Sequence, residues 1–212
     1  MEKDVLFFAM PKTGSYSWSA YFYENNLKIK GHDTRDVNYK YPWECNVVKE
    51  NWTFTFVRNP IDRFLSAFNY LSNGGNCEHD RIESNLIIPN NYKFNPEEWT
   101  QDILLNSKEI ILNQIHFKPQ HDWIFNKLEK TFINKIYLYD DGFEKPILEI
   151  SKKINKKIKI NKYNVTKNKN TILSNSSIEI IENIYFKDFK LIKNIKKQCG
   201  IKKIMEESQL RT

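Results

Sequence analysis

The sequence has no hydrophobic run long enough to cross a membrane or to direct export. Its first apolar stretch covers only residues 5–10 and stops at Pro11. A signal peptide needs an apolar stretch of about 7–15 residues, and a transmembrane helix needs about 20. The sequence therefore predicts no membrane span and no export signal, and we expect a cytoplasmic protein.

Cysteine is also scarce. The chain has 3 cysteines, Cys45, Cys77 and Cys199, and they are widely spaced. They form no CxxC pair and have no histidine partner at metal-ligand spacing. We expect free thiols in a reducing compartment and no metal site.

The chain lacks internal repeats and any segment with the composition of a linker. Its 212 residues are 40% apolar and include 5 Trp, 11 Tyr and 14 Phe. This length and this apolar content suffice for one substantial hydrophobic core. The sequence predicts a single domain over residues 1–212.

Positive charge is abundant but unevenly distributed. Residues 1–150 carry 17 basic and 21 acidic side chains, a net charge of −4, whereas residues 151–212 carry 16 basic and 5 acidic side chains, a net charge of +11. Such a basic segment favours phosphorylated or sulfated partners and nucleic acid alike. A solvated lysine-rich surface explains the same composition.

Two segments predict a buried strand followed directly by a helix. The first joins the apolar run of residues 4–10 to a helix over residues 15–26. The second joins the aromatic and β-branched run of residues 52–57 to a helix from Pro60 to about Tyr70. Strand-to-helix switching therefore occurs twice.

The rest of the chain predicts further helices, one more strand and a long loop. We expect the loop over residues 73–95, which contain Gly74-Gly75, Pro89 and Asn90-Asn91. The other predicted elements are helices at residues 96–107, 123–129, 143–155 and 176–198, the last capped by Gly200, and a strand at residues 135–139. Strands that alternate with helices indicate an α/β fold, here a three-layer, P-loop-like arrangement with a central parallel sheet flanked by helices.

Residues 11–17, which we call the first loop, have the composition of a phosphate-binding loop. A strand that runs through a short glycine-containing loop into a helix presents unpaired N–H groups and the positive end of the helix dipole to an anion. Lys12 adds a charge, and Gly14 allows a close backbone approach. Hydroxyl donors come from Thr13, Ser15 and Ser17. The Walker A spacing is absent, which disfavours a magnesium-dependent NTPase.

A second anion site is predicted where the second strand ends. Arg58 stands at that strand end, where ligands of open α/β sheets collect, and its guanidinium can hold a phosphate through two hydrogen bonds. Ser66 lies two turns into the following helix, for which Asn59 suits the N-cap and Asp62 the reciprocal capping position. Arg63 either belongs to this site or pairs with Asp62 in solvent. The two sites together predict a nucleotide ligand with two separated phosphates.

These residues resemble the motifs of the sulfotransferases that use 3′-phosphoadenosine 5′-phosphosulfate (PAPS), especially the carbohydrate branch. The first loop, Pro-Lys-Thr-Gly-Ser-Tyr-Ser, is similar to the family's 5′-phosphosulfate loop, Pro-Lys-Thr-Gly-x-x-Ser. Residues 58–66 are similar to its 3′-phosphate motif, Arg-(Asp/Asn)-Pro-x-x-Arg-x-x-Ser. Residues 116–120, His-Phe-Lys-Pro-Gln, and residues 185–189, Tyr-Phe-Lys-Asp-Phe, resemble two later motifs of the carbohydrate branch. Tyr16 departs from the small hydroxyl residue that is usual at its position.

The resemblance implies an enzyme that moves the sulfuryl group of PAPS, its co-substrate, onto an acceptor hydroxyl and releases PAP, without a metal. The acceptor would be a glycan or another hydroxyl compound, and Lys12 would stabilise the charge on the leaving phosphate. The residues implied to bind the 5′-phosphosulfate are Lys12, Thr13, Gly14, Ser15, Tyr16 and Ser17, and those implied to bind the 3′-phosphate are Arg58 and Ser66. The sequence carries no signal of oligomeric state.

An acceptor hydroxyl needs a general base, for which histidine is the usual residue. His32 follows the first predicted helix, where related enzymes often place a catalytic histidine, and His116 belongs to the third motif. We favour His32 as the base, with His116 as the second candidate and a carboxylate as a further alternative. His79 and His121 are predicted to lie at the surface.

Three other functions fit parts of this pattern. A P-loop-type kinase also holds phosphate between a strand and a helix, but it would use ATP and magnesium. A nucleic-acid-binding protein would use the basic segment at residues 151–212. A protein of the same fold that binds PAP without turnover would account for Tyr16. The paired loops favour the sulfotransferase, and we expect no specific nucleic-acid partner.

Overall fold

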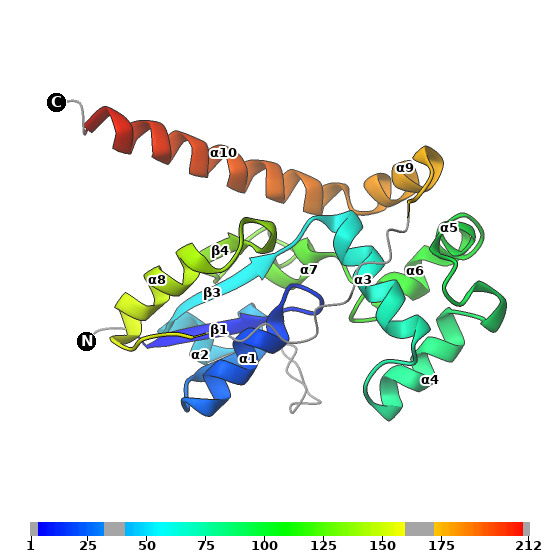
Figure 1. Cartoon of the computed structure of the whole chain (residues 1–212), viewed down its shortest axis with the longest axis horizontal. Coiled ribbons are helices and arrows are strands. Elements are labelled where there is room, and N and C mark those ends of the chain that lie inside the picture. The colour runs from blue at the N-terminus through cyan, green and yellow to red at the C-terminus, as the bar shows by residue number, and fades with distance from the viewer. Residues whose placement is uncertain (1–3, 32–40, 160–171, 210–212) are drawn as a thin grey trace.

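A four-stranded parallel sheet forms the centre of the molecule. The computed structural model describes residues 4–31, 41–159 and 172–209. Its strands are β1 (Val5–Ala9), β2 (Lys28–Gly31), β3 (Trp52–Val57) and β4 (Lys135–Leu138), in the order β2-β1-β3-β4 (Figure 1). The pairings β1–β2, β1–β3 and β3–β4 are parallel, so the carboxyl ends of the strands share one edge of the sheet. The strand order reverses between β1 and β3, which is where open α/β sheets bind their ligands.

Side chains alternate between the two faces of the sheet. Phe7, Phe54 and Phe56 lie on one face and form a tightly packed aromatic core with α1 (Ser15–Glu24) and α8 (Glu144–Ile154). Phe7 and Phe54 stack at 5.1 Å between ring centroids across the β1–β3 pair. This core fixes α1, and therefore the loop that precedes it, against the two central strands.

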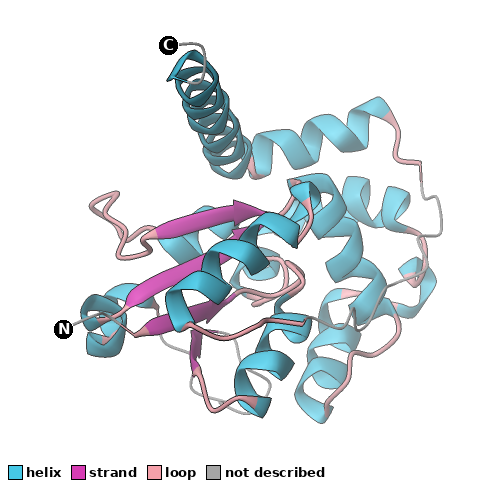
Figure 2. Cartoon of the chain, turned by 60° about the vertical axis from the view of Figure 1, so that its left-hand side comes forward, coloured by secondary structure: helices cyan, strands magenta, loops and turns pink. Residues whose placement is uncertain are grey.

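Other helices cover the opposite face. Leu6 and Val57 pack there with side chains of α2 (Asn46–Glu50), α7 (Gln120–Ile124) and α10 (Phe186–Gln209). The strands lie between these helices and those of the first face, and α10 extends away from the rest of the molecule (Figure 2). The predicted three-layer α/β fold is therefore confirmed.

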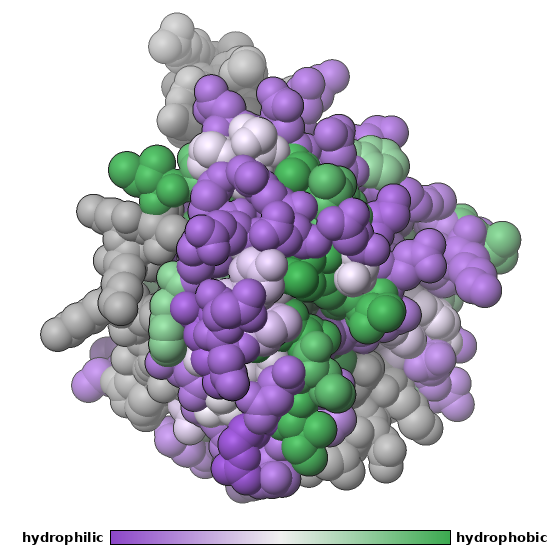
Figure 3. All heavy atoms as spheres, turned by 90° about the vertical axis from the view of Figure 1, so that its right-hand side faces the viewer, coloured by the Kyte–Doolittle hydropathy of each residue, from purple (hydrophilic) through white to green (hydrophobic). Residues whose placement is uncertain are grey.

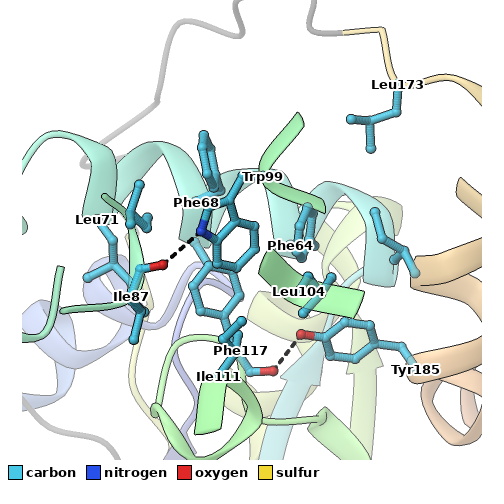
Figure 4. Close-up of a cluster of buried hydrophobic side chains, with 13 residues drawn as sticks. Phe64, Phe68, Leu71, Ile87, Trp99, Leu104, Ile111, Phe117, Leu173 and Tyr185 are labelled. Atoms are coloured by element: carbon cyan, nitrogen blue, oxygen red, sulfur yellow. Dashed lines mark hydrogen bonds between the residues drawn. The ribbon is translucent and has the colours of Figure 1, made fainter. Parts of the chain in front are cut away.

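A further group of helices lies beside the sheet and has its own core. Trp99, Phe64 and Phe117 are buried at its centre, and the indole Nε1 of Trp99 donates to the carbonyl of Ile87 at 2.8 Å (Figure 4). The elements of this group are α3 (Pro60–Ser72), α4 (Glu78–Ile87), α5 (Pro96–Trp99), a π-helical turn (Thr100–Leu104), α6 (Leu105–Asn113) and α9 (Asn175–Ile184). Short 3-10 turns occur at Pro42–Glu44, Asn90–Tyr92 and Tyr139–Asp141.

The outer face of this group mixes polar and apolar side chains (Figure 3). Leu86 of α4 is 76% exposed and Ile110 of α6 is 70% exposed. Across the described residues, no helix combines the length and the apolar character that a membrane span requires.

The prediction of a loop over residues 73–95 is wrong, because this segment contains α4. Few of its side chains are apolar, and the helix is held by tertiary contacts instead: the buried Ser84 hydroxyl donates to the carbonyl of Leu71 at 2.5 Å, and Ile87 packs into the helical core. The sequence pattern also missed β2. Its Lys-Ile-Lys-Gly run is short and polar, as edge strands often are.

The C-terminal helix was predicted as one element, but the structure divides it. α9 ends at Ile184 and α10 begins at Phe186, because Tyr185 leaves the helical conformation and is buried. Gly200 does not cap the helix, since α10 continues to Gln209. Similarly, the predicted helix at residues 123–129 is α7, which begins at Gln120 and ends at Ile124.

The helix predicted at residues 96–107 is also longer and less regular than expected. It comprises α5, the π-helical turn and α6, and it continues to Asn113 with a non-helical backbone at Ser107. The predicted start at Pro96 is correct, but periodicity does not distinguish a π-helical turn from an α-helix.

Candidate active site

The first loop leaves β1 and enters α1 through two residues with left-handed backbones. Lys12 has φ 65° and Gly14 has φ 76°. A Cβ at Gly14 would lie 2.6 Å from the ring of Tyr139, so the position needs glycine for both space and conformation. The hydroxyl of Thr13 is buried and donates to the carbonyl of Met10 at 3.0 Å, which holds the loop to the end of β1.

The second loop, residues 58–59, follows β3, the strand next to β1, so the two loops lie side by side. Nη1 of Arg58 donates to the carbonyl of Lys12 at 3.5 Å, and the Arg58 guanidinium lies 5.0 Å from the centre of the Tyr139 ring. The side chain of Asn59 caps α3 as predicted, accepting from Ile61 N at 2.9 Å. The reciprocal partner is not Asp62, because Asn59 N–H donates to Asp140 at 2.9 Å.

Side chains on one face of α3, which belongs to the second motif, contact the first loop. Nε of Arg63 donates to the carbonyl of Pro11 at 3.1 Å, and the Lys12 ammonium lies 3.8 Å from the centre of the Tyr70 ring. Ser66 is three residues after Arg63 and four before Tyr70, so it shares the face of the helix that is turned toward the first loop. The residues predicted from the two motifs therefore meet in one place.

Arg63 is buried, so of the two alternatives given for it the surface ion pair with Asp62 is wrong. Its Nη1 donates to the carbonyl of Lys118 at 2.9 Å, in addition to the bond from Nε to Pro11. Burial lowers the pKa of Arg63, and the nearby charge of Asp188 opposes that shift. The side chain thus connects the first loop to the segment that contains His116.

The ammonium of Lys12 has an unusual environment for a lysine. Burial, followed by the positive charges of Arg58 and Arg63, lowers its pKa to about 8, although Asp80 acts in the opposite direction. The aromatic face of Tyr70 offers the cation a favourable contact without neutralising it. Positive charge therefore predominates around the first loop.

His116 lies next to Tyr70, with 4.9 Å between the ring centroids. It is 3% exposed, and its Nε2 lies 3.3 Å from Oδ1 of Asp80, whose Oδ2 accepts from the Tyr70 hydroxyl at 2.5 Å. Burial lowers the pKa of His116, and the charge of Lys12 adds to that effect. Burial raises the pKa of Asp80, but hydrogen bonds from His116 and Tyr70 outweigh it and hold this pKa below its usual value.

The other histidines have different positions. His32 lies outside the described residues. His79 is exposed, as predicted, and it pairs with Glu83. The predicted surface position of His121 is wrong, because this side chain is mostly buried with Nε2 2.8 Å from Glu129. Tyr16 is 49% exposed in the first turn of α1, so its side chain points away from the buried part of the loop.

Sequence reasoning missed Tyr70 and Asp80, since neither belongs to a motif. It also gave no connection between the two later motifs, which contact each other. The Tyr185 hydroxyl donates to the carbonyl of Phe117 at 2.6 Å (Figure 4), and Asp188 accepts from Gln120 N–H at 2.8 Å. The motif at residues 185–189 therefore holds the motif at residues 116–120 in place.

Comparison with known proteins identifies the family. A model of the sulfotransferase family matches residues 2–193, which is most of the chain. The chain belongs to the sulfotransferase family. No curated protein and no solved structure matches it. Enzymes of this family transfer a sulfuryl group from PAPS, so the chain is a PAPS-dependent sulfotransferase that acts on an acceptor hydroxyl.

The unusual environment of Lys12 predicts an unusual titration. With a pKa of about 8, half of the Lys12 side chains are neutral and reactive at pH 8, whereas fewer than about 1% of ordinary lysines are. The labelling rate of Lys12 by an amine-directed acylating reagent should therefore rise with a midpoint near pH 8. Mass spectrometry of labelled peptides from pH 6 to 11 measures this midpoint, which is independent of how accessible the amine is.

Lys187 serves as the internal control for this experiment. Its pKa is raised by the hydrogen bond to Glu129, so its labelling rate should still be rising at pH 10.5. A Lys12 midpoint near that of Lys187 would contradict the described environment of Lys12.

Proposed function

We propose that the first loop binds the 5′-phosphosulfate of PAPS and that Arg58 and Ser66 bind its 3′-phosphate. The observation that carries the proposal is the meeting of the two loops, where Arg58 reaches the carbonyl of Lys12 and Arg63 the carbonyl of Pro11. The two loops hold more hydrogen-bond donors and positive charges than acceptors, and a ligand with two phosphates would satisfy them. Nε of Arg58 is buried with no acceptor among the described residues, and no side chain at Gly14 obstructs the loop.

Each residue of the first loop has a distinct part in this proposal. The N–H groups at the start of α1 and the hydroxyls of Ser15 and Ser17 donate to the anion. Thr13 contributes its N–H, because its hydroxyl is used within the loop. Tyr16 likewise contributes its N–H rather than its side chain, which replaces the contact expected from a small hydroxyl residue.

Lys12 stabilises the charge that develops when the sulfuryl group leaves. PAPS supplies the activated sulfuryl group, and in-line transfer asks the protein mainly for positioning and electrostatic stabilisation. With a pKa of about 8, Lys12 is already mostly protonated at neutral pH, and a bound anion stabilises the protonated ammonium further. It can then donate a proton or a hydrogen bond to the bridging oxygen of the leaving phosphate.

His116 is our proposed general base. In the tautomer that donates from Nε2 to Asp80, Nδ1 is the basic nitrogen that would take the proton of the acceptor hydroxyl. Its lowered pKa keeps the ring neutral near pH 7, as a base requires. His32 remains the alternative base, and a carboxylate such as Asp80 is a third.

A carbohydrate is our proposed acceptor. The resemblance of residues 116–120 and 185–189 to the carbohydrate branch supports a sugar hydroxyl. The exposed lysines of α10, among them Lys190, Lys193 and Lys197, would attract an acidic glycan.

Ligand binding tests the nucleotide assignment. PAP should raise the melting temperature of the protein, whereas ATP with magnesium should do so much less. Lys12→Ala and Arg58→Ala each remove a charge-assisted contact of about 1.5–3 kcal/mol, so each should weaken PAP binding roughly 10- to 100-fold. Lys187→Ala removes an exposed, Glu129-paired charge and serves as the control. Stabilisation by ATP and magnesium alone would instead indicate a kinase.

Sulfuryl transfer to a panel of compounds tests the acceptor. With radiolabelled PAPS, label should pass to glycans rather than to small phenols. It should pass faster to acidic glycans than to neutral ones, and this preference should weaken with added salt. Transfer to phenols alone would refute the carbohydrate acceptor. Binding of PAP without transfer to any hydroxyl would indicate a protein that has lost turnover.

Substitution of the histidines tests the base. His116→Gln should lower kcat by about 10²- to 10⁴-fold and leave PAP affinity within about twofold. Because the pKa of His116 is lowered from 6.5, loss of the base should reduce kcat/KM only below pH 6.5, whereas deprotonation of Lys12 should reduce it toward and above pH 8. His79→Gln is the matched surface control. If His32→Gln has the large effect instead, His32 is the base.

A further inference from the structure

The side-chain amide of Gln120 forms hydrogen bonds with both backbone polar groups of Arg58, its N–H and its carbonyl. Arg58 N–H donates to Oε1 of Gln120 at 2.8 Å, and Nε2 of Gln120 donates to the carbonyl of Arg58 at 2.9 Å. The β3–β4 ladder ends one residue earlier, at Val57 and Leu138. The side-chain amide of Gln120 therefore takes the place of a strand partner for Arg58.

Asp188 fixes the orientation of this amide. Its Oδ2 accepts from Gln120 N–H at 2.8 Å and from Nε2 of Gln120 at 3.4 Å, and its Oδ1 accepts from His121 N–H at 2.7 Å. Because Nε2 faces both a carboxylate and the Arg58 carbonyl, Oε1 must face the Arg58 N–H. Gln120 and Asp188 are both fully buried, so no water competes for these bonds.

Gln120 and Asp188 are also connected to the first loop, through Arg63. Burial raises the pKa of Asp188, and the positive charge of Arg63, which donates to Pro11 and Lys118, opposes that shift. The two buried opposite charges therefore stabilise each other. The backbone of Arg58 is thus set by side chains from α7 and α10, and the guanidinium extends from that fixed backbone toward Lys12 and Tyr139.

We propose that Gln120 is a positioning residue for Arg58: it holds the backbone from which the guanidinium reaches the 3′-phosphate, and Asp188 of the C-terminal helix holds Gln120. This inference rests on the proposed role of Arg58 as a ligand of the 3′-phosphate. It assigns a task to the last residue of the motif at residues 116–120 and to the aspartate of the motif at residues 185–189.

Comparing PAP with 5′-AMP tests the inference, because the two ligands differ only in the 3′-phosphate. By isothermal titration calorimetry, Gln120→Met should weaken PAP binding about tenfold and change AMP binding less than twofold. Arg58→Ala should remove the preference for PAP over AMP. The double variant with Arg58→Ala and Gln120→Met should then be no weaker for PAP than Arg58→Ala alone.

Gln114→Met is the matched control. Gln114 is also buried, and its side chain also accepts from backbone N–H groups, those of His116 and Phe117, but it does not contact Arg58. This variant should lose thermal stability while keeping the ratio of PAP to AMP affinity. If Gln120→Met does not fold, Gln120→Asn keeps a buried amide that is too short to reach both groups of Arg58, and it should show the same selective loss.

The outcomes separate the inference from the function on which it rests. An equal loss of PAP and AMP affinity in the Gln120 variants, or no loss, would overturn the positioning role alone if Arg58→Ala still removes the preference for PAP. If Arg58→Ala keeps that preference, the assignment of Arg58 to the 3′-phosphate fails, and the role of Gln120 fails with it.

Discussion

The buried guanidinium of Arg63 joins the segments from which the candidate active site is built. It donates to the backbone of Pro11 in the first loop and to Lys118 beside His116, and its charge is balanced by Asp188 on α10. Removing a charge from water costs several kcal/mol, which such bonds and an opposite charge must offset. The bonds from Arg63 therefore restrict α3 to one arrangement relative to the first loop and to the segment that contains His116.

The same arrangement leaves positive charge uncompensated at the site. Lys12, Arg58 and Arg63 lie close enough for the two arginines to lower the pKa of Lys12, and Asp80 offsets this only in part. A folded protein gains nothing from this repulsion, but a phosphorylated ligand relieves it. The donors are already held in place without the ligand, so reorganising them on binding costs little free energy.

The parts of the site that follow from local sequence were predictable. Apolar runs gave β1 and β3, Asn59 gave the start of α3, and the strand ends placed Lys12 and Arg58 at one edge of the sheet. The burial of Arg63 was not predictable, because its hydrogen-bond partners, the carbonyls of Pro11 and Lys118, are distant in sequence and are brought to it only by the fold. The position of Asp80 was missed for a related reason: α4 is held by contacts such as that of Ser84 with Leu71, and these leave no periodic apolar pattern.

The motifs at residues 116–120 and 185–189 show that a sequence match does not reveal what each of its residues does. Residues 116–120 include an irregular segment whose backbone cannot be satisfied by a helix or a sheet, so side chains supply the missing partners: Tyr185 for Phe117, Arg63 for Lys118 and Asp188 for Gln120. The residues of the motif at 185–189 therefore support the backbone of the motif at residues 116–120. The donors that we propose for the phosphates come from the two loops and from α3, and their geometry depends on buried polar side chains that need not touch the ligand.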